Sequence, residues 1–222
     1  MSFPLFSASM MCAKYGNLEQ EVKQLETAVD SFHIDIMDGE FVDNFGMGYQ
    51  DMEFIRQHTE KFVDVHLMVC KPLLYLPLLF ELGVDVVYIH PEADRDPATT
   101  IEKIKANGLT AGIAVNPGTA VSTISELLNV VDRVLVLGVN PGHAGRKYQN
   151  YVDKKIFKLL ELRSSLNFQI WLDGAVTVDR INYWFPRGVD GFILGTSFLF
   201  KDNGLSYSEK IMQFRSLSSN TK

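Results

Sequence analysis

Short apolar segments alternate with longer amphipathic segments along the whole chain. The apolar segments are rich in Val, Ile and Phe and often end near Gly, Pro or Asn, which is typical of buried strands. The predicted strands are residues 5–10, 32–36, 62–69, 85–90, 110–115, 132–139, 168–173 and 189–194. The predicted helices lie near residues 17–29, 51–60, 72–83, 97–107, 120–129, 150–164, 177–185 and 205–217.

Residues with special backbone preferences support several of these helix boundaries. Pro72 would stand in the first turn of its helix, where a missing N–H costs little. Gly83 and Gly108 fall where helices commonly end. Asp96 and Thr177 have side chains that can cap a helix N-terminus.

The alternation amounts to eight strand-then-helix units in 222 residues. Each unit is about 28 residues long, close to the length of a βαβ unit. Strict alternation with buried strands predicts a parallel sheet, and eight units predict a (β/α)8 TIM barrel. An open doubly wound sheet is the alternative, but it predicts a Gly-rich fingerprint after the first strand, which the sequence lacks. With no linker in view, we expect residues 1–222 to form a single domain.

The charge balance limits the classes of partner. The chain has 21 basic and 27 acidic residues, a net charge of −6, so we expect no binding to nucleic acid or to an anionic membrane. Cys12 and Cys70 are too few for a disulfide framework and favour a reduced, cytoplasmic setting. The N-terminus does not resemble a signal peptide, and no apolar run is long enough to predict a membrane span.

The second predicted strand carries a histidine and a carboxylate on one face. His33 and Asp35 are two residues apart, so they point to the same side, while the isoleucines beside them point to the other. If the isoleucines pack on the helices, His33 and Asp35 point into the barrel, where a charge is costly unless it is paired or bound to a metal. A hydrogen-bonded core pair and a metal site both fit this pattern.

Two further strand ends carry metal-ligand types. His66 lies near the end of the third predicted strand and Asp173 at the end of the seventh. Alone, His66 would suit a satisfied core histidine, and Asp173 a turn or N-cap. Together with His33 and Asp35 they form a set of two histidines and two carboxylates, which suits Zn²⁺ and nearly as well Fe²⁺, Mn²⁺ or Co²⁺.

Three turns rich in small residues follow the last three predicted strands, at Gly142–Gly145, Gly174–Ala175 and Gly195–Thr196. Small residues let backbone N–H groups approach a phosphate, and barrels often bind phosphate after their seventh and eighth strands. Any one of these turns could be ordinary, but three in succession favour a phosphate site.

At these residues the sequence resembles the ribulose-phosphate 3-epimerase family. The resemblance covers nearly the whole chain and rests on His33-Ile-Asp-Ile-Met-Asp-Gly39 with Phe41-Val42, His66-Leu-Met-Val69, Val139-Asn-Pro-Gly142 and Asp173-Gly174. It implies a TIM barrel of the ribulose-phosphate-binding type and an isomerase that uses one divalent metal ion to invert C3 of a phosphorylated ketose through an enediolate. The expected reaction converts D-ribulose 5-phosphate to D-xylulose 5-phosphate, or D-allulose 6-phosphate to D-fructose 6-phosphate.

The resemblance also implies roles for individual residues. Asp35 would be the general base and Asp173 the general acid, with the roles exchanged in the reverse direction. His33, Asp35, His66 and Asp173 would hold the metal ion, which we expect to be zinc. The substrate and its phosphate would contact Ser9, Met37, His66, Met68, Gly142, His143, Ala144, Gly145, Asp173, Gly174, Ala175, Gly195 and Thr196.

The sequence departs from the family's pattern outside the metal set. The family usually has Pro where Asp43 stands, an aromatic residue at His143 and Gln at Arg146. The other departures are Ala8, Lys14, Glu40 and Leu137. Ser9-Met-Met-Cys12, His90-Pro91-Glu92 and Ala144 favour the D-allulose-6-phosphate 3-epimerase branch.

Two other functions stay open at this point. One is a different phosphate-barrel enzyme, such as a hexulose-phosphate synthase or a relative of orotidine-phosphate decarboxylase, although Asp64-Val65-His66 does not supply the Asp-x-Lys that the decarboxylase needs. The other is a phosphosugar-binding barrel without catalytic activity. The family resemblance further suggests a homo-oligomer.

Overall fold

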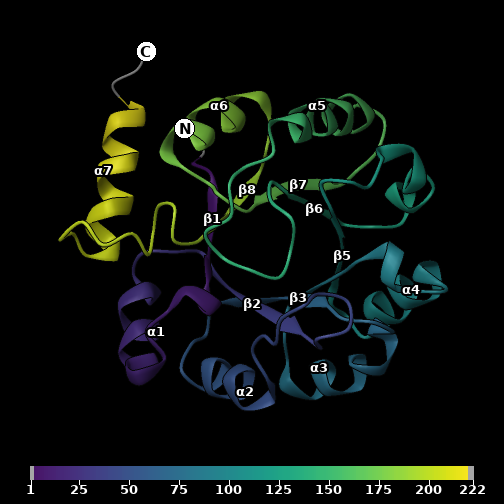
Figure 1. The fold of residues 1–222 in the computed structure, drawn as a ribbon, viewed down its shortest axis with the longest axis horizontal. Helices are drawn as coiled ribbons and strands as arrows, with labels where there is room; N and C mark the ends of the chain where they lie inside the picture. The colour runs from purple at the N-terminus through teal and green to yellow at the C-terminus, as the bar shows by residue number, and fades with distance from the viewer. Residues whose placement is uncertain (1–2, 220–222) are drawn as a thin grey trace.

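Eight parallel strands form a closed barrel in the computed structural model, which describes residues 3–219 (Figure 1). Each strand pairs with the next along the chain, and the last pairs with the first. The predicted (β/α)8 barrel is therefore confirmed. The strands are β1 Leu5–Ser9, β2 Ser31–Met37, β3 Phe62–Met68, β4 Val86–Ile89, β5 Thr110–Val115, β6 Arg133–Leu137, β7 Gln169–Asp173 and β8 Gly191–Leu194.

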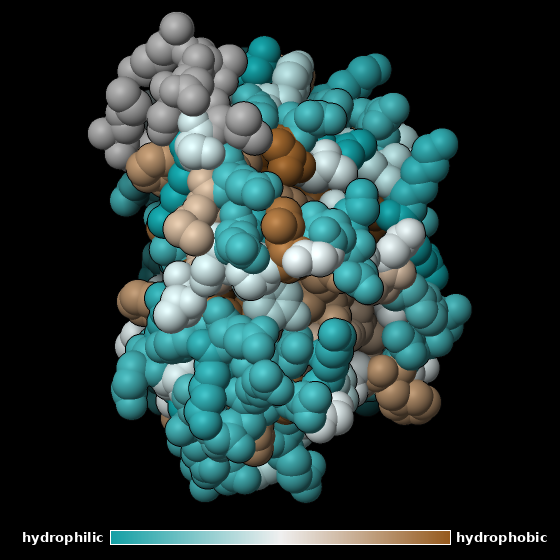
Figure 2. All heavy atoms as spheres, turned by 90° about the vertical axis from the view of Figure 1, so that its left-hand side faces the viewer, coloured by the Kyte–Doolittle hydropathy of each residue, from teal (hydrophilic) through white to brown (hydrophobic). Residues whose placement is uncertain are grey.

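Seven α-helices among the described residues surround the barrel (Figure 1). They are α1 Leu18–Glu26, α2 Tyr49–Gln57, α3 Leu76–Leu82, α4 Pro97–Ala106, α5 Asp153–Leu162, α6 Val178–Trp184 and α7 Tyr207–Ser219. None of these helices is long and apolar enough to cross a membrane. Figure 2 views the side that carries α7 and α1 and shows a mostly hydrophilic surface with scattered hydrophobic residues, as expected for amphipathic helices that bury one face.

The predicted helix over 120–129 is wrong. Two short 3-10 helices, Val121–Thr123 and Leu127–Asn129, take its place. The Thr123 hydroxyl donates to the Ala120 carbonyl (2.7 Å) and the Ser125 hydroxyl to the Ser122 carbonyl (3.1 Å). Such local hydrogen bonds compete with the α-helical ladder, and the β-branched residues of this segment add little helix propensity to resist them.

The other helix boundaries follow the predicted signals closely. The segment over 72–83 begins with a 3-10 turn at Pro72 and ends at Gly83, whose φ of 68° is left-handed. The Asp96 side chain accepts from the Thr99 N–H, and the Thr177 side chain accepts from the Arg180 N–H. These predicted caps are therefore confirmed.

The strands bury apolar side chains on both faces. The larger cluster fills the space between barrel and helices, and a smaller one fills part of the barrel interior. The inner cluster consists of Val86, Tyr88, Ala114, Leu135, Leu137, Trp171 and Ile193, which come from β4 to β8. The inward residues of β1, β2 and β3 are mostly polar instead, so the interior has an apolar side and a polar side.

Glycines make room for the two largest side chains of the interior. Tyr88 lies opposite Gly112 in the β4–β5 register, and Trp171 lies opposite Gly191 in the β7–β8 register. A Cβ at Gly191 would lie 2.5 Å from the Trp171 ring. Because Trp171 is almost fully buried, its ring has little space in which to move away.

We therefore predict that Gly191→Ala lowers the free energy of unfolding by about 1–3 kcal/mol, the usual cost of overpacking a core. Urea denaturation followed by circular dichroism measures the change. Gly118→Ala is the matched control, because a Cβ at Gly118 would meet nothing within 4 Å. Equal stability of the two variants would contradict this account of the interior.

Candidate active site

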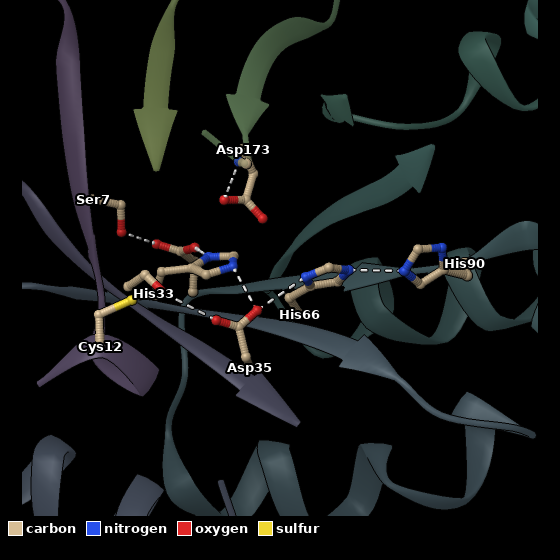
Figure 3. A network of polar contacts seen from close by, with 10 residues as sticks. Ser7, Cys12, His33, Asp35, His66, His90 and Asp173 are labelled. Carbon is tan, nitrogen blue, oxygen red and sulfur yellow. Dashed lines mark hydrogen bonds and ion pairs between the residues drawn. The ribbon is translucent and has the colours of Figure 1, made fainter. Parts of the chain in front are cut away.

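Four side chains converge at the carboxyl ends of the strands (Figure 3). They are His33 and Asp35 from β2, His66 from β3 and Asp173 from β7, and one possible ligand atom of each lies within 4.8 Å of the others. His33, Asp35 and His66 are buried, and Asp173 is half-buried. The closed barrel thus brings together residues that are up to 140 positions apart, from 33 to 173.

His33 is oriented by a carboxylate on its far side. Its Nδ1 is hydrogen-bonded to the Asp64 carboxylate, which also accepts a hydrogen bond of 2.8 Å from the Ser7 hydroxyl. Its Nε2 has no hydrogen-bond partner among the described residues, although it lies 3.3 Å from Asp35 Oδ1. Burial opposes a charge on this ring, but Asp35 and Asp64 raise the pKa of His33 well above its ordinary value.

Asp64 was not among the predicted site residues. It lies two positions before His66 on β3, so the same rule that placed His33 and Asp35 on one face also places Asp64 inside the barrel. The signal was therefore present in the sequence. Its partner, however, is set by the β2–β3 register, which places His33 beside Asp64.

Asp35 and Asp173 have opposite electrostatic environments. Burial disfavours a charge on Asp35, but His33 and His66 outweigh it and lower the pKa of Asp35 below its ordinary value. Burial and the nearby Asp35 raise the pKa of Asp173. The Ser9 hydroxyl donates to Asp35 Oδ2 (3.1 Å), and the Gly174 N–H donates to Asp173 Oδ1 (2.6 Å).

His90 contacts the side of His66 that faces away from the four-residue cluster. His66 Nδ1 lies 3.2 Å from Asp35 Oδ1, and its Nε2 lies 2.8 Å from His90 Nε2 (Figure 3). Burial lowers the pKa of His90 to about 4. Glu92 Oε1 lies 3.9 Å from His90 Nδ1 and accepts hydrogen bonds from Asn116 (2.7 Å) and Thr119 (2.8 Å).

The four-residue cluster suits a divalent metal ion. Two imidazoles and two carboxylates are the donor types that Zn²⁺ and related ions bind. The Nε2 of buried His33 makes no hydrogen bond among the described residues, and in its unprotonated form its lone pair would bind such an ion. Asp64 is hydrogen-bonded to Nδ1 on the far side of the ring and so orients Nε2 toward the cluster, as the carboxylates behind metal-bound histidines do.

A second cluster of possible metal ligands lies nearby, but its central carboxylate is used in hydrogen bonds to loop backbone. Asp38, Glu40 and Cys70 also come within 4.8 Å of one another. The Asp38 carboxylate accepts from the backbone N–H groups of Glu40 (2.9 Å), Phe41 (2.9 Å) and Cys70 (2.6 Å). These bonds join the loop after β2 to the loop after β3. They give the Asp38 carboxylate a structural role that needs no bound ion.

A cavity lies above the four-residue cluster and opens to solvent. Its walls include all the residues predicted to contact substrate: Ser9, Met37, His66, Met68, Gly142, His143, Ala144, Gly145, Asp173, Gly174, Ala175, Gly195 and Thr196. Met37 and Met68 are buried and pack with Val42 on one wall. Gly174 has a φ of 87°, and a Cβ there would lie 2.6 Å from Val139, so only glycine fits this turn.

Comparison with known proteins assigns the family. The model of the ribulose-phosphate 3 epimerase family matches residues 5–199. The chain belongs to this family. It is 35% identical to the ribulose-phosphate 3-epimerase of Methanocaldococcus jannaschii, over 88% of this chain and 84% of that protein. It is 31% identical to the one of Buchnera aphidicola, over 97% and 96%. As a member of a family of epimerases, the protein is an isomerase.

Solved structures with the same fold are more distant in sequence. KGPDC from Streptococcus mutans superposes with a TM-score of 0.68 at 14% identity, covering 98% of each chain. Phosphoribosyl anthranilate isomerase from Thermococcus kodakaraensis superposes with a TM-score of 0.67 at 11% identity, covering 98% of this chain and all of that one. At these identities the likeness concerns the barrel fold alone.

Two departures from the epimerase pattern contact each other across the cavity mouth. Asp43, in the loop after β2, lies 3.2 Å from His143, in the loop after β6. The next residue, Asn44, donates a hydrogen bond of 2.6 Å to the Gly142 carbonyl. The loop after β6 is therefore held by the loop after β2, and Arg146, also exposed, lies on the same cavity wall.

We predict that Asn44→Ala releases the loop after β6. Trypsin can cleave after Arg146 and Lys147 in this exposed segment, and we expect cleavage there to become about tenfold faster, since losing such a hydrogen bond costs about 1 kcal/mol or more. Mass spectrometry of the digest measures the rate. Asp43→Ala is the control, because an exposed ion pair contributes little, and its rate should stay within about threefold of wild type. Unchanged cleavage in Asn44→Ala would show that this hydrogen bond does not hold the loop.

Proposed function

We propose that this protein is a metal-dependent ketose-phosphate 3-epimerase that interconverts D-ribulose 5-phosphate and D-xylulose 5-phosphate. The observation that carries the proposal is the cluster of His33, Asp35, His66 and Asp173 at the floor of an open cavity. Membership of the epimerase family, whose curated members named above carry the ribulose-phosphate name, supports the same reaction.

The four cluster residues would hold the metal ion. Zn²⁺ is our first choice for a mixed imidazole and carboxylate set, and Fe²⁺, Mn²⁺ and Co²⁺ are alternatives. When bound, the ion supplies Lewis-acid stabilisation of the negative charge that proton removal leaves on the substrate oxygens. Ser9 holds one oxygen of Asp35, which leaves the other oxygen facing His33 and His66.

Asp35 and Asp173 would carry the proton at C3. Inversion needs a proton removed from one face of C3 and another returned to the opposite face, and two carboxylates can do this. Asp35 comes from β2 and Asp173 from β7, so they reach the cavity from different sides of the barrel (Figure 3). In one direction Asp35 takes the proton and Asp173 returns one, and in the other direction the roles exchange.

The three turns after β6, β7 and β8 would bind the rest of the substrate. Their backbone N–H groups suit a phosphate, since small residues let the backbone come close. Arg146 adds a cationic side chain to this wall of the cavity, which together with the backbone N–H groups would let an acidic protein hold an anion. Met37 and Met68 exclude water around the carbon chain without adding hydrogen bonds.

The proposed site has two candidate substrates that differ in length, a pentulose phosphate and a hexulose phosphate. Of the residues that favour the allulose branch, four line the cavity, namely Ser9, Met11, Cys12 and Ala144, whereas His90 and Glu92 lie behind His66. His90 and Glu92, which follow β4, therefore do not line the substrate cavity. We propose the pentulose phosphate as the better substrate, and the hexulose phosphate stays a prediction.

Replacing each carboxylate separates proton removal from inversion. With one epimer in D₂O, we expect Asp35→Asn to lose both C3 deuterium exchange and conversion by about 10²–10⁴-fold. With the same epimer, Asp173→Asn should keep more exchange than conversion, because Asp35 can still remove the proton. The opposite epimer should reverse this order. NMR of the sugar measures both rates.

Asp179→Asn, at an exposed position of α6, is the control and should keep wild-type rates. The metal content of each variant is measured as well, because the two carboxylates are also proposed ligands. Full exchange in both site variants would overturn the assignment. Tight binding of sugar phosphate by the metal-loaded wild type without turnover would favour a non-catalytic barrel.

Two further measurements test the metal requirement and the choice of substrate in the proposed function. We expect a chelator to abolish turnover, and one equivalent of Zn²⁺, Mn²⁺, Fe²⁺ or Co²⁺ to restore it, because the oxyanion loses its Lewis acid when the ion leaves. The kcat/KM for ribulose 5-phosphate should exceed that for allulose 6-phosphate by about tenfold or more, within the range that one extra carbon in a pocket provides. Full activity in the chelated protein would exclude a metal role.

A further inference from the structure

We infer that His90 is a positioning residue that fixes the tautomer of His66, so that the Nδ1 lone pair of His66 faces the proposed metal ion. This inference rests on the metal site of the proposed function. It concerns the interior contact between β3 and the end of β4, which lies outside the substrate cavity.

The geometry around His66 assigns a different task to each ring nitrogen. Its Nδ1 faces Asp35 at 3.2 Å, on the side of the ligand cluster. Its Nε2 faces His90 Nε2 at 2.8 Å, on the side away from it. Both rings are almost fully buried, so water does not compete for these nitrogens.

Two nitrogens at 2.8 Å need one proton between them. A hydrogen bond forms only if one Nε2 carries the proton and the other offers a lone pair. If Nδ1 of His66 binds an ion, it must be unprotonated, so a neutral His66 carries its proton on Nε2 and donates it to His90. His90 Nε2 is then the acceptor, and the His90 proton lies on Nδ1, which faces Glu92 Oε1 at 3.9 Å.

The surroundings of His90 keep its ring in this orientation. The ring packs against Phe41 with centroids 4.6 Å apart, and Pro91 follows it at the start of a 3-10 turn. Glu92 is held in turn by Asn116 and Thr119. These contacts hold the His90 ring with its Nε2 toward His66, as Asp64 holds the ring of His33, the other histidine ligand.

The test compares zinc affinity and histidine tautomers in wild type, His90→Gln and His90→Leu. Leu removes the acceptor, while the Gln side-chain oxygen can still accept from His66 Nε2–H. Competition with a chromophoric chelator gives the zinc dissociation constant, and ¹⁵N NMR of the histidine rings gives the tautomer of His66. Neither readout depends on turnover.

We expect the zinc dissociation constant of His90→Leu to rise about 10–100-fold, the usual effect of removing the group behind a metal-bound histidine. His90→Gln should recover part of this loss. In zinc-loaded wild type, His66 should carry its proton on Nε2. Tyr88→Phe is the control, because it removes another buried polar atom of β4, and its affinity should stay within about threefold of wild type.

An unchanged zinc affinity in His90→Leu, or a His66 proton on Nδ1 in the zinc-loaded wild type, would overturn the inference. The NMR measurement on the wild type tests the predicted His66 tautomer even if His90→Leu does not fold. Failure of the wild type to bind one zinc ion per chain would instead overturn the proposed metal site, and the inference with it. The wild-type zinc titration therefore separates the two failures.

Discussion

The candidate active site depends on the pairing of two short polar patterns on neighbouring parallel strands. β2 carries His33-Ile34-Asp35 and β3 carries Asp64-Val65-His66, and the register places His33 beside Asp64 and Asp35 beside His66. Each buried histidine therefore meets a carboxylate, which offsets the cost of removing both from water. If the pairing of β2 with β3 shifted by one residue, the polar side chains of one strand would turn toward the helices. Those of the other strand would then stay inside the barrel without partners.

The apolar half of the interior gives these polar residues a fixed frame. Tyr88 and Trp171 fill the barrel opposite Gly112 and Gly191, and they leave little space for neighbouring strands to shift. β4 contributes to both halves, because Tyr88 packs in the apolar cluster and His90, two residues later, contacts His66. A rigid frame of this kind keeps ligands from three different strands within reach of one ion.

Two departures from the family's pattern, Asp43 and His143, lie at the cavity mouth, whereas Leu137 lies in the cavity wall and Ala8 is buried in β1. The four proposed ligands are those that the family resemblance implies, whereas Asp43 and His143 depart from the family's pattern and contact each other. A paired change between two loops can keep them together while the chemistry below stays the same. The chain belongs to the epimerase family even though these residues differ from its pattern.

The sequence alone determined the barrel and the face on which each strand residue lies. Eight apolar segments and the spacing of His33 and Asp35 were enough for both, because strand side chains alternate with a period of two. The segment over 120–129 has a helical pattern, but its hydroxyl groups bond to nearby carbonyls and it forms two 3-10 turns instead. Only the tertiary structure decided the partners: Asp64 for His33, His90 for His66, and Asp43 for His143. Such contacts depend on strand register and on loops that meet in space, and neither is encoded in the spacing along a single segment.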